Sequence, residues 1–281
     1  MAGPDYRTLS IARAEGVATV TLDHPPMNLL DAPLMGDLDR LGRELEADPD
    51  TRVAIFQSAN PDYFIAHADV ALIQRLPAEA PPKSSELSFF HQMVERFRRL
   101  PLATIGLIEG RARGGGSELL LSLDMRYGAI GRCIVSQPEV ALGILPGGSG
   151  TQRLARLAGR GRALEAVLGC ADFDAETAER YGWIDRALPA DALRPFVAAL
   201  AKRIASFPRE AVAFAKRAVD AADPTLREGL LEEAHLFGQL VATPAARERM
   251  ATFLAKGGQD PEQELDLEAL FARIWPDGGA R

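Results

Sequence analysis

The sequence predicts a mixed α/β fold with largely parallel strand pairing, and three of its features carry that prediction. Short apolar runs at 53–56 and 103–108 are typical of buried strands. Amphipathic segments separate such runs, and chains that alternate strands with helices build parallel sheets. After about Ser206 the pattern becomes entirely helical. We therefore expect an α/β core over residues 1–205 and a C-terminal helical region over residues 206–281.

The first elements follow from simple periodicities. Apolar and β-branched residues at 9–11 and 17–22 flank the sequence Ala-Glu-Gly at 14–16, which predicts a β-hairpin. Leucines at 34, 38, 41 and 45 fall on one stripe of a helix. The run at 53–56 then predicts a short buried strand.

The second half of the core repeats this order. A strand is predicted at 103–108, followed by a turn at glycines 114–116, a buried helix from 117–123 and a strand at 125–129. The segment 77–86 is rich in proline and polar residues, which predicts a loop between two helical stretches.

The C-terminal helices have recognisable ends. Pro208 can begin one helix, and Thr243 followed by Pro244 is typical of an N-cap with proline at the first helical position. Gly257 and Gly258 are expected to end that helix. Asp260 with Pro261 then predicts the start of a last helix.

The composition excludes several classes of protein. A chain of 281 residues with 47% hydrophobic and 25% charged residues is ordinary for a globular enzyme, and a net charge of −7 argues against nucleic acid as a partner. The N-terminus lacks a signal peptide pattern, no apolar run is long enough to span a membrane, and only Cys133 and Cys170 are present. We expect a cytoplasmic protein. The four histidines lie far apart in the sequence, so no metal site is expected.

A glycine run and two isolated carboxylates predict an active site. Gly114, Gly115 and Gly116 lie between a strand and a helix, where glycines let a ligand approach backbone N–H groups. Glu118 follows in the first turn of the helix, and Glu139 lies in a second apolar segment. Two carboxylates that share a poorly solvated pocket differ in proton affinity, so one can act as an acid and the other as a base.

Each carboxylate also has a purely structural interpretation. Glu118 could complement a helix N-terminus, and Gln137-Pro138-Glu139 could simply begin another helix. A dinucleotide site is disfavoured, because a G-x-G-x-x-G motif with an acidic residue on a second strand is not met.

These residues resemble the enoyl-CoA hydratase/isomerase, or crotonase, superfamily. The resemblance covers nearly the whole chain and is most specific at GGGSE (114–118) and QPEVALGILPGGSGTQRL (137–154). It implies a crotonase-like spiral of repeated ββα units with a C-terminal helical region for trimerisation and nucleotide cover. It also implies homotrimers, often paired into hexamers.

The resemblance implies roles for individual residues. Ala68, in FIAHADV (64–70), and Gly115 would supply the backbone N–H groups of an oxyanion hole for the thioester oxygen. Glu118 and Glu139 match the two catalytic glutamates of the hydratases.

Coenzyme A contacts follow from the same resemblance. The backbone around Ala66 would meet the adenine, and Lys256, in ATFLAKGG (251–258), would reach the phosphates. Asp69 and Gly114 are expected beside the bound acyl-CoA, although Asp69 is also placed to cap the following helix. Four further apolar residues are candidate walls of the acyl pocket, with ordinary helix packing as the alternative: Leu72, Ile73, Leu76 and Phe89.

The chain departs from the family pattern at three positions. His67 stands where glycine is usual, and a loop side chain is expected there rather than a base. Arg111 and Arg113 precede the glycines where small or apolar residues are more usual. These arginines could contact phosphates or narrow the acyl pocket, and Arg113 could equally form a structural ion pair.

The resulting functional hypothesis is an enoyl-CoA hydratase that adds water across a 2-trans-enoyl-CoA thioester, with Glu118 as the base and Glu139 as the proton donor to the α-carbon. No metal or redox cofactor is expected, because coenzyme A enters as part of the substrate. A double-bond isomerase, another crotonase-type reaction and a non-catalytic acyl-CoA binder remain alternatives.

Overall fold

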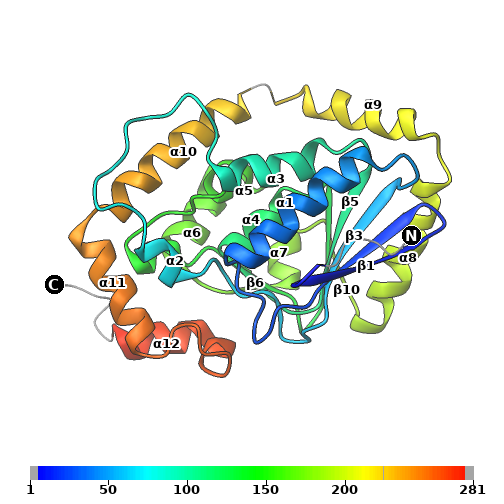
Figure 1. Ribbon diagram of the computed structural model, residues 1–281. Helices are drawn as coiled ribbons and strands as arrows, with labels where there is room; N and C mark the ends of the chain where they lie inside the picture. The colour runs from blue at the N-terminus through cyan, green and yellow to red at the C-terminus, as the bar shows by residue number, and fades with distance from the viewer. Residues whose placement is uncertain (1–5, 224, 276–281) are drawn as a thin grey trace.

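The computed structural model describes residues 6–223 and 225–275, and its core is built on two sheets (Figure 1). The larger sheet has the spatial order β1 (Leu9–Ala14), β2 (Val17–Leu22), β3 (Val53–Ser58), β5 (Ala103–Ile108), β7 (Met125–Ala129) and β10 (Arg186–Leu188). β1 and β2 pair antiparallel, and the other neighbours pair in parallel. Glu15 and Gly16 both have positive φ in the turn between β1 and β2, which suits a tight hairpin. The predicted hairpin is confirmed.

The second sheet explains the repeating architecture. It contains β4 (Tyr63–Ile65), β6 (Arg111–Arg113), β8 (Ile134–Ser136) and β9 (Phe173–Asp174), in that order. Each strand β3, β5 and β7 of the larger sheet is followed directly by β4, β6 or β8 of the smaller one, and a helical segment follows each pair. The expected spiral of ββα units is therefore confirmed.

Most helices of the core cover these sheets. They are α1 (Ala32–Ala47), α2 (Val70–Gln74), α3 (Phe89–Arg99), α4 (Gly115–Leu121), the 3₁₀ helix η1 (Glu139–Leu142), α5 (Gly150–Ala158), α6 (Arg160–Gly169), α7 (Ala175–Tyr181) and α8 (Ala190–Ala205). Asp31 caps α1 by accepting a hydrogen bond from the N–H of Leu34 at 3.0 Å. The helix after the glycine run begins at Gly115 rather than at Ser117, because two of the glycines themselves adopt helical backbone.

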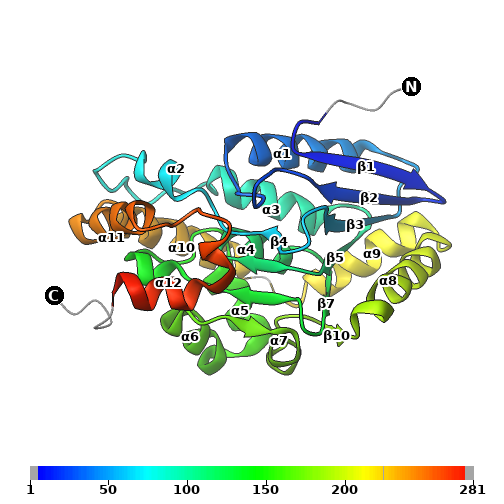
Figure 2. The same ribbon diagram turned by 90° about the horizontal axis from the view of Figure 1, so that it is seen from below.

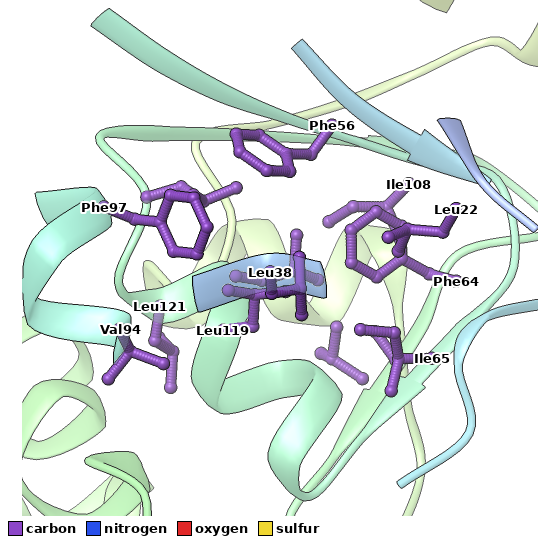
Figure 3. Close-up of a cluster of buried hydrophobic side chains, with 14 of the residues drawn as sticks. Leu22, Leu38, Phe56, Phe64, Ile65, Val94, Phe97, Ile108, Leu119 and Leu121 are labelled. Atoms are coloured by element: carbon purple, nitrogen blue, oxygen red, sulfur yellow. The ribbon is translucent and has the colours of Figure 1, made fainter. Parts of the chain in front are cut away.

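Helix α4 lies at the centre of the packing, and all seven of its residues are buried. Figure 3 shows Leu119 and Leu121 of α4 close to Val94 and Phe97 of α3, within the same cluster as residues of the two sheets. Because α4 is enclosed on all sides, its first turn is held in a fixed place. That turn carries Gly115 and Glu118.

Every described element after Ser206 is helical, as predicted: α9 (Arg209–Asp220), α10 (Leu226–Val241), α11 (Pro244–Ala255), η2 (Gln263–Asp266) and α12 (Leu267–Ile274). Figures 1 and 2 show α12 and α8 at opposite ends of the molecule. The prediction that Asp260 opens the last helix needs correction, since Asp260 accepts hydrogen bonds in the turn before η2 and Asp266 caps α12. None of the described helices is long and apolar enough to cross a membrane.

Candidate active site

A cavity of about 310 Å³ opens between α2, α3, α4 and α10. Its polar lining includes Glu118, Glu139 and Asp69, whereas most of its walls are apolar. All four candidate wall residues of the sequence analysis line it, together with aromatic and aliphatic side chains from other elements: Leu30, Met35, Leu72, Ile73, Leu76, Phe89, Phe90, Ile144 and Phe237. Phe237 contributes to this wall from α10. Apolar cavities with a few convergent polar groups are the usual form of small-molecule sites.

Two backbone N–H groups meet at one wall of the cavity. A Cβ atom placed on Gly115 would lie 3.5 Å from the nitrogen of Ala68, so the two residues are close neighbours. Within the described residues, neither the Ala68 N–H nor the Gly115 N–H has a hydrogen-bond partner. Gly114 makes this approach possible, because its backbone has φ +48° and ψ −122°, a conformation that favours glycine. The sequence-predicted pair therefore presents two free donors to the same space.

Glu118 projects from the first turn of α4 and is 4% exposed. Its Oε1 atom accepts hydrogen bonds from the N–H groups of Gly148 and Gly150, at 2.7 and 2.9 Å. Burial, followed by the charge of Glu233, raises the pKa of Glu118 to about 8, although the two N–H donors and Arg153 act in the opposite direction. Glu118 thus gains or loses its proton close to neutral pH.

Glu139 lies at the first position of η1, after Pro138, and is 9% exposed. In the amide orientation that satisfies both groups, Gln137 donates to Oε1 and Oε2 of Glu139 at 3.2 and 3.1 Å. Burial and the charge of Glu118 raise the pKa of Glu139 well above its ordinary value. The interpretation that Gln137-Pro138-Glu139 begins a helix is therefore correct for the backbone. The side chain of Glu139 nevertheless lines the same cavity as Glu118.

His67 lies on the far side of the N–H wall. Its Nε2 atom is 2.8 Å from Oε2 of Glu264 in η2, and its Nδ1 atom is 2.8 Å from the carbonyl of Ala68. Burial alone would lower the pKa of His67, but the charge and hydrogen bonds of Glu264 raise it overall. The pKa of Glu264 is lowered despite burial, because His67 favours its ionised form. The expected loop side chain is thus half of a buried ion pair.

Arg111 and Arg113 hold the same C-terminal segment. Arg113 is fully buried and donates to both carboxylate oxygens of Asp172, at 2.8 and 2.5 Å, and to the carbonyl of Glu264 at 2.7 Å. Arg111 donates to the carbonyl of Leu265 at 2.8 Å. Neither side chain lines the cavity. Of the alternatives left open, the structural ion pair is the one formed by Arg113.

The candidate coenzyme A residues occupy different environments. Ala66 is fully buried and its N–H donates to the carbonyl of Met27 at 3.1 Å, so this N–H is not available to a nucleobase. Asp69 caps α2 through the N–H of Ala71 at 2.9 Å and also lines the cavity. Lys256 is exposed at the C-terminal end of α11, and its ammonium group has no ion-pair partner among the described residues.

The structure adds residues that the sequence analysis did not single out. Glu233 of α10 is 2% exposed and lies close enough to raise the pKa values of Glu118 and Glu139. Its position was readable in principle, since Glu233 falls in phase with the apolar stripe of Leu226, Leu230 and Val241. A carboxylate at a core position of a stripe is a sign of a specific buried partner.

Comparison with known proteins identifies the family. The family model for enoyl-CoA hydratase/isomerase matches residues 12–264. This chain belongs to the enoyl-CoA hydratase/isomerase family.

Relatives within the enoyl-CoA hydratase/isomerase family match over most of their lengths. The protein named probable enoyl-CoA hydratase echA8 of Mycobacterium leprae is 34% identical over 89% of this chain and 96% of its own. The short-chain-enoyl-CoA hydratase of Clostridium acetobutylicum is 30% identical over 88% of this chain and 94% of its own. A crystal structure of a candidate enoyl-CoA hydratase from Streptomyces avermitilis shares 40% identity with a TM-score of 0.88, and the match covers 97% of this chain and 100% of that one.

Proposed function

We propose that the protein is an enoyl-CoA hydratase, which adds water across the double bond of a 2-trans-enoyl-CoA thioester. The observation that carries this proposal is the convergence of two free N–H groups and two buried carboxylates on one apolar cavity. The relatives named as enoyl-CoA hydratases support it. An isomerase needs only one proton-shuttling carboxylate, so the presence of both favours hydration.

In this proposal the N–H groups of Ala68 and Gly115 bind the thioester oxygen. They polarise the carbonyl and stabilise the enolate-like charge that forms when the β-carbon is attacked. Such donors act strongly in a site with few competing waters, because they are already oriented before the reaction. No metal or redox cofactor is then required, and coenzyme A enters with the substrate.

Glu118 and Glu139 divide the proton transfers. Glu118 takes a proton from water as the oxygen bonds to the β-carbon, and Glu139 gives its proton to the α-carbon. The assignment follows from their environments. Two backbone N–H groups stabilise the ionised form of Glu118, whereas burial and the negative charge of Glu118 favour the protonated form of Glu139. Glu118 is therefore the easier of the two to ionise.

The substrate contacts are proposed from the same geometry. The apolar walls suit an unsubstituted hydrocarbon acyl chain. Asp69 and Gly114 would lie beside the thioester end, the backbone around Ala66 would meet the adenine, and Lys256 would approach the phosphates.

We also propose that the protein is a homotrimer or a hexamer of two trimers, with residues 206–281 serving assembly and nucleotide cover. Helix α9 has no buried residue, and its Phe214 and Val219 are 63% and 75% exposed. Apolar exposure of this extent favours a subunit contact. Light scattering after size exclusion tests the oligomeric state directly.

Cys133 and Cys170 are unpaired, which suits a cytoplasmic protein.

The deciding experiment follows the loss of the conjugated enoyl-thioester absorbance with short, long and aromatic 2-enoyl-CoAs, and identifies the product by mass. Gain of one water is expected. A product of unchanged mass would replace the proposal with an isomerase. Tight binding without any chemistry across the panel would instead indicate another reaction of the family or a non-catalytic acyl-CoA binder.

A further inference from the structure

Glu233 is a buried carboxylate of α10 that has no part in the proton transfers proposed above. Its two oxygens accept hydrogen bonds from backbone N–H groups at the start of α5, namely those of Ser149 (2.5 Å), Thr151 (2.9 Å) and Gln152 (3.3 Å). They also accept a hydrogen bond from the hydroxyl of Thr151. His91 of α3 lies on its other side, with Nε2 3.0 Å from Oε1 of Glu233 and no exposed surface. A carboxylate buried this deeply is retained only where such partners compensate its loss of water.

The same stretch of backbone also holds Glu118. Residues 148–152 contribute five consecutive N–H groups, and Gly148 and Gly150 donate to Oε1 of Glu118 while the other three donate to Glu233. The N–H groups at a helix start have no partners inside the helix and carry partial positive charge. Two carboxylates from opposite sides therefore share one set of donors, and the position of one constrains the position of the other.

The charged groups around this segment come from every neighbouring element. Helix α3 contributes His91 and Glu95, and α5 contributes Arg153, which pairs with Glu95 and donates to the hydroxyl of Ser149 at 3.0 Å. Further cations come from Arg98 and Arg99 of α3 and from Arg156 of α5: Arg99 lies 3.3 Å from Glu95, and Arg156 donates to the carbonyl of Gln152 at 2.9 Å. The carboxylates of Glu118, Glu139 and Glu233 also act on one another here, while the buried guanidinium of Arg153 already has Glu95 as its partner.

We propose that Glu233, held by His91, is a positioning residue for Glu118. It fixes the segment 148–152 so that Gly148 and Gly150 present their N–H groups to Oε1 of Glu118. Oε2 of Glu118 makes no hydrogen bond within the described residues, which leaves that oxygen for the substrate water. A residue of the C-terminal helices thereby sets the geometry of a side chain in the centre of the core.

The charge of Glu233 has a second effect on Glu118. Like charges at short range favour the protonated form of a carboxyl group, and Glu233 contributes to the raised pKa of Glu118. Removing the Glu233 charge is therefore expected to lower the pH at which Glu118 ionises. Only the kinetic consequences of this inference rest on the proposed function.

The first test follows Glu118 itself and needs no turnover. The carbonyl stretch of the protonated Glu118 carboxyl is identified in the infrared spectrum as the band that is lost in Glu118→Gln. The pH midpoint of this band is then measured in Glu233→Gln, with Glu118→Gln/Glu233→Gln as the reference that lacks the band. We expect the midpoint to fall by about 1 pH unit or more. An unchanged midpoint would overturn the electrostatic part of the inference.

The second test measures position through kinetics with a 2-enoyl-CoA. Glu233→Asp keeps the charge but withdraws the carboxylate by one methylene, so kcat is expected to fall about tenfold to a hundredfold with KM nearly unchanged. A wild-type kcat in this variant would overturn the positioning role. If Glu233→Gln does not fold, Glu233→Asp still tests the positioning role.

Asp124→Asn is the matched control. Asp124 is likewise a largely buried carboxylate tied to a C-terminal helix, and it accepts from the N–H of Thr104 at 2.7 Å and from Lys216 of α9 at 2.8 Å. Its loss should lower the melting temperature while the Glu118 midpoint and kcat stay as in the wild type. If the wild type hydrates no enoyl-CoA, the proposed function fails, whereas the infrared midpoint still decides the role of Glu233.

Discussion

The starts of α4 and α5 lie on two sides of the same cavity, and they use their backbone donors in opposite ways. At the start of α4 no side chain caps the helix, and the Gly115 N–H stays free beside that of Ala68. At the start of α5 the N–H groups of residues 148–152 are all occupied by carboxylates. The start of α4 can therefore bind negative charge that develops on a ligand, whereas the donors at the start of α5 already bind carboxylates.

The difference lies in where the compensating charge is placed. Behind the α4 wall, the ion pair between His67 and Glu264 holds the loop from outside the cavity, so its N–H groups face inward unpaired. At the α5 wall, Glu118 itself enters the cavity and Glu233 holds the donors from behind. A reaction that forms an oxyanion needs free N–H donors such as those of the α4 wall. A reaction that also moves protons needs a positioned carboxylate such as Glu118 at the α5 wall.

The largest expected effect comes from the carboxylates that enter the cavity. Glu118→Gln and Glu139→Gln should each lower kcat by about 10²–10⁴, because the amide can neither accept nor supply the proton. Acyl-CoA affinity, measured by calorimetry, should stay within a few-fold of the wild type. Unchanged turnover in either variant would remove that residue from the mechanism.

The next effect comes from closing the free N–H wall. The Cβ of Gly115→Ala would lie 2.9 Å from Leu30 Cδ2 and 3.5 Å from the Ala68 nitrogen, in front of the paired donors. We expect kcat to fall by about 10²–10³. Gly161→Ala is the control, since a Cβ there meets no atom within 4 Å. Equal activity of the two variants would show that the wall does not bind the reacting oxygen.

The ion pair behind that wall should matter mainly for stability. His67→Gln leaves the Glu264 charge buried without its cation, which is expected to cost about 3–5 kcal/mol of unfolding free energy in urea at pH 7. The double variant His67→Gln/Glu264→Gln should recover much of this loss, since both charges are then removed. Additive losses would mean that the two groups do not interact.

A pH dependence of stability further distinguishes the two walls. Because the pKa of Glu118 is raised to about 8, the folded protein holds a proton between about pH 4.5 and 8 that the unfolded chain has released. Stability from this group is therefore complete below about pH 4.5 and lost as the pH rises to about 8. Urea melts at pH 5 and pH 9 should show that the free energy of unfolding of Glu118→Gln increases relative to that of the wild type as the pH rises. A difference between the two proteins that is the same at both pH values would contradict the raised pKa.

Much of the fold could be predicted because its causes are local. The hairpin at Glu15-Gly16, the leucine stripe of α1, the strand at 103–108 and the Thr243 cap all depend on residues within a few positions of each other. The helix after the glycines was predicted too late in the chain, because glycine is a poor helix former in isolation and the buried setting of α4 overrides that preference.

The sequence by itself, through its resemblance to the enoyl-CoA hydratase/isomerase family, predicted the family, the ββα repeat and the proposed site residues Ala68, Gly115, Glu118 and Glu139, because the motifs that carry the resemblance lie in continuous segments. Only the tertiary structure decided what surrounds them. Glu233 lies 115 positions after Glu118, yet both accept N–H groups from the same backbone segment, and Glu264 meets His67 across 197 positions. Such pairings depend on how the C-terminal helices pack against the core, and burial then fixes proton affinities that no short stretch of sequence specifies.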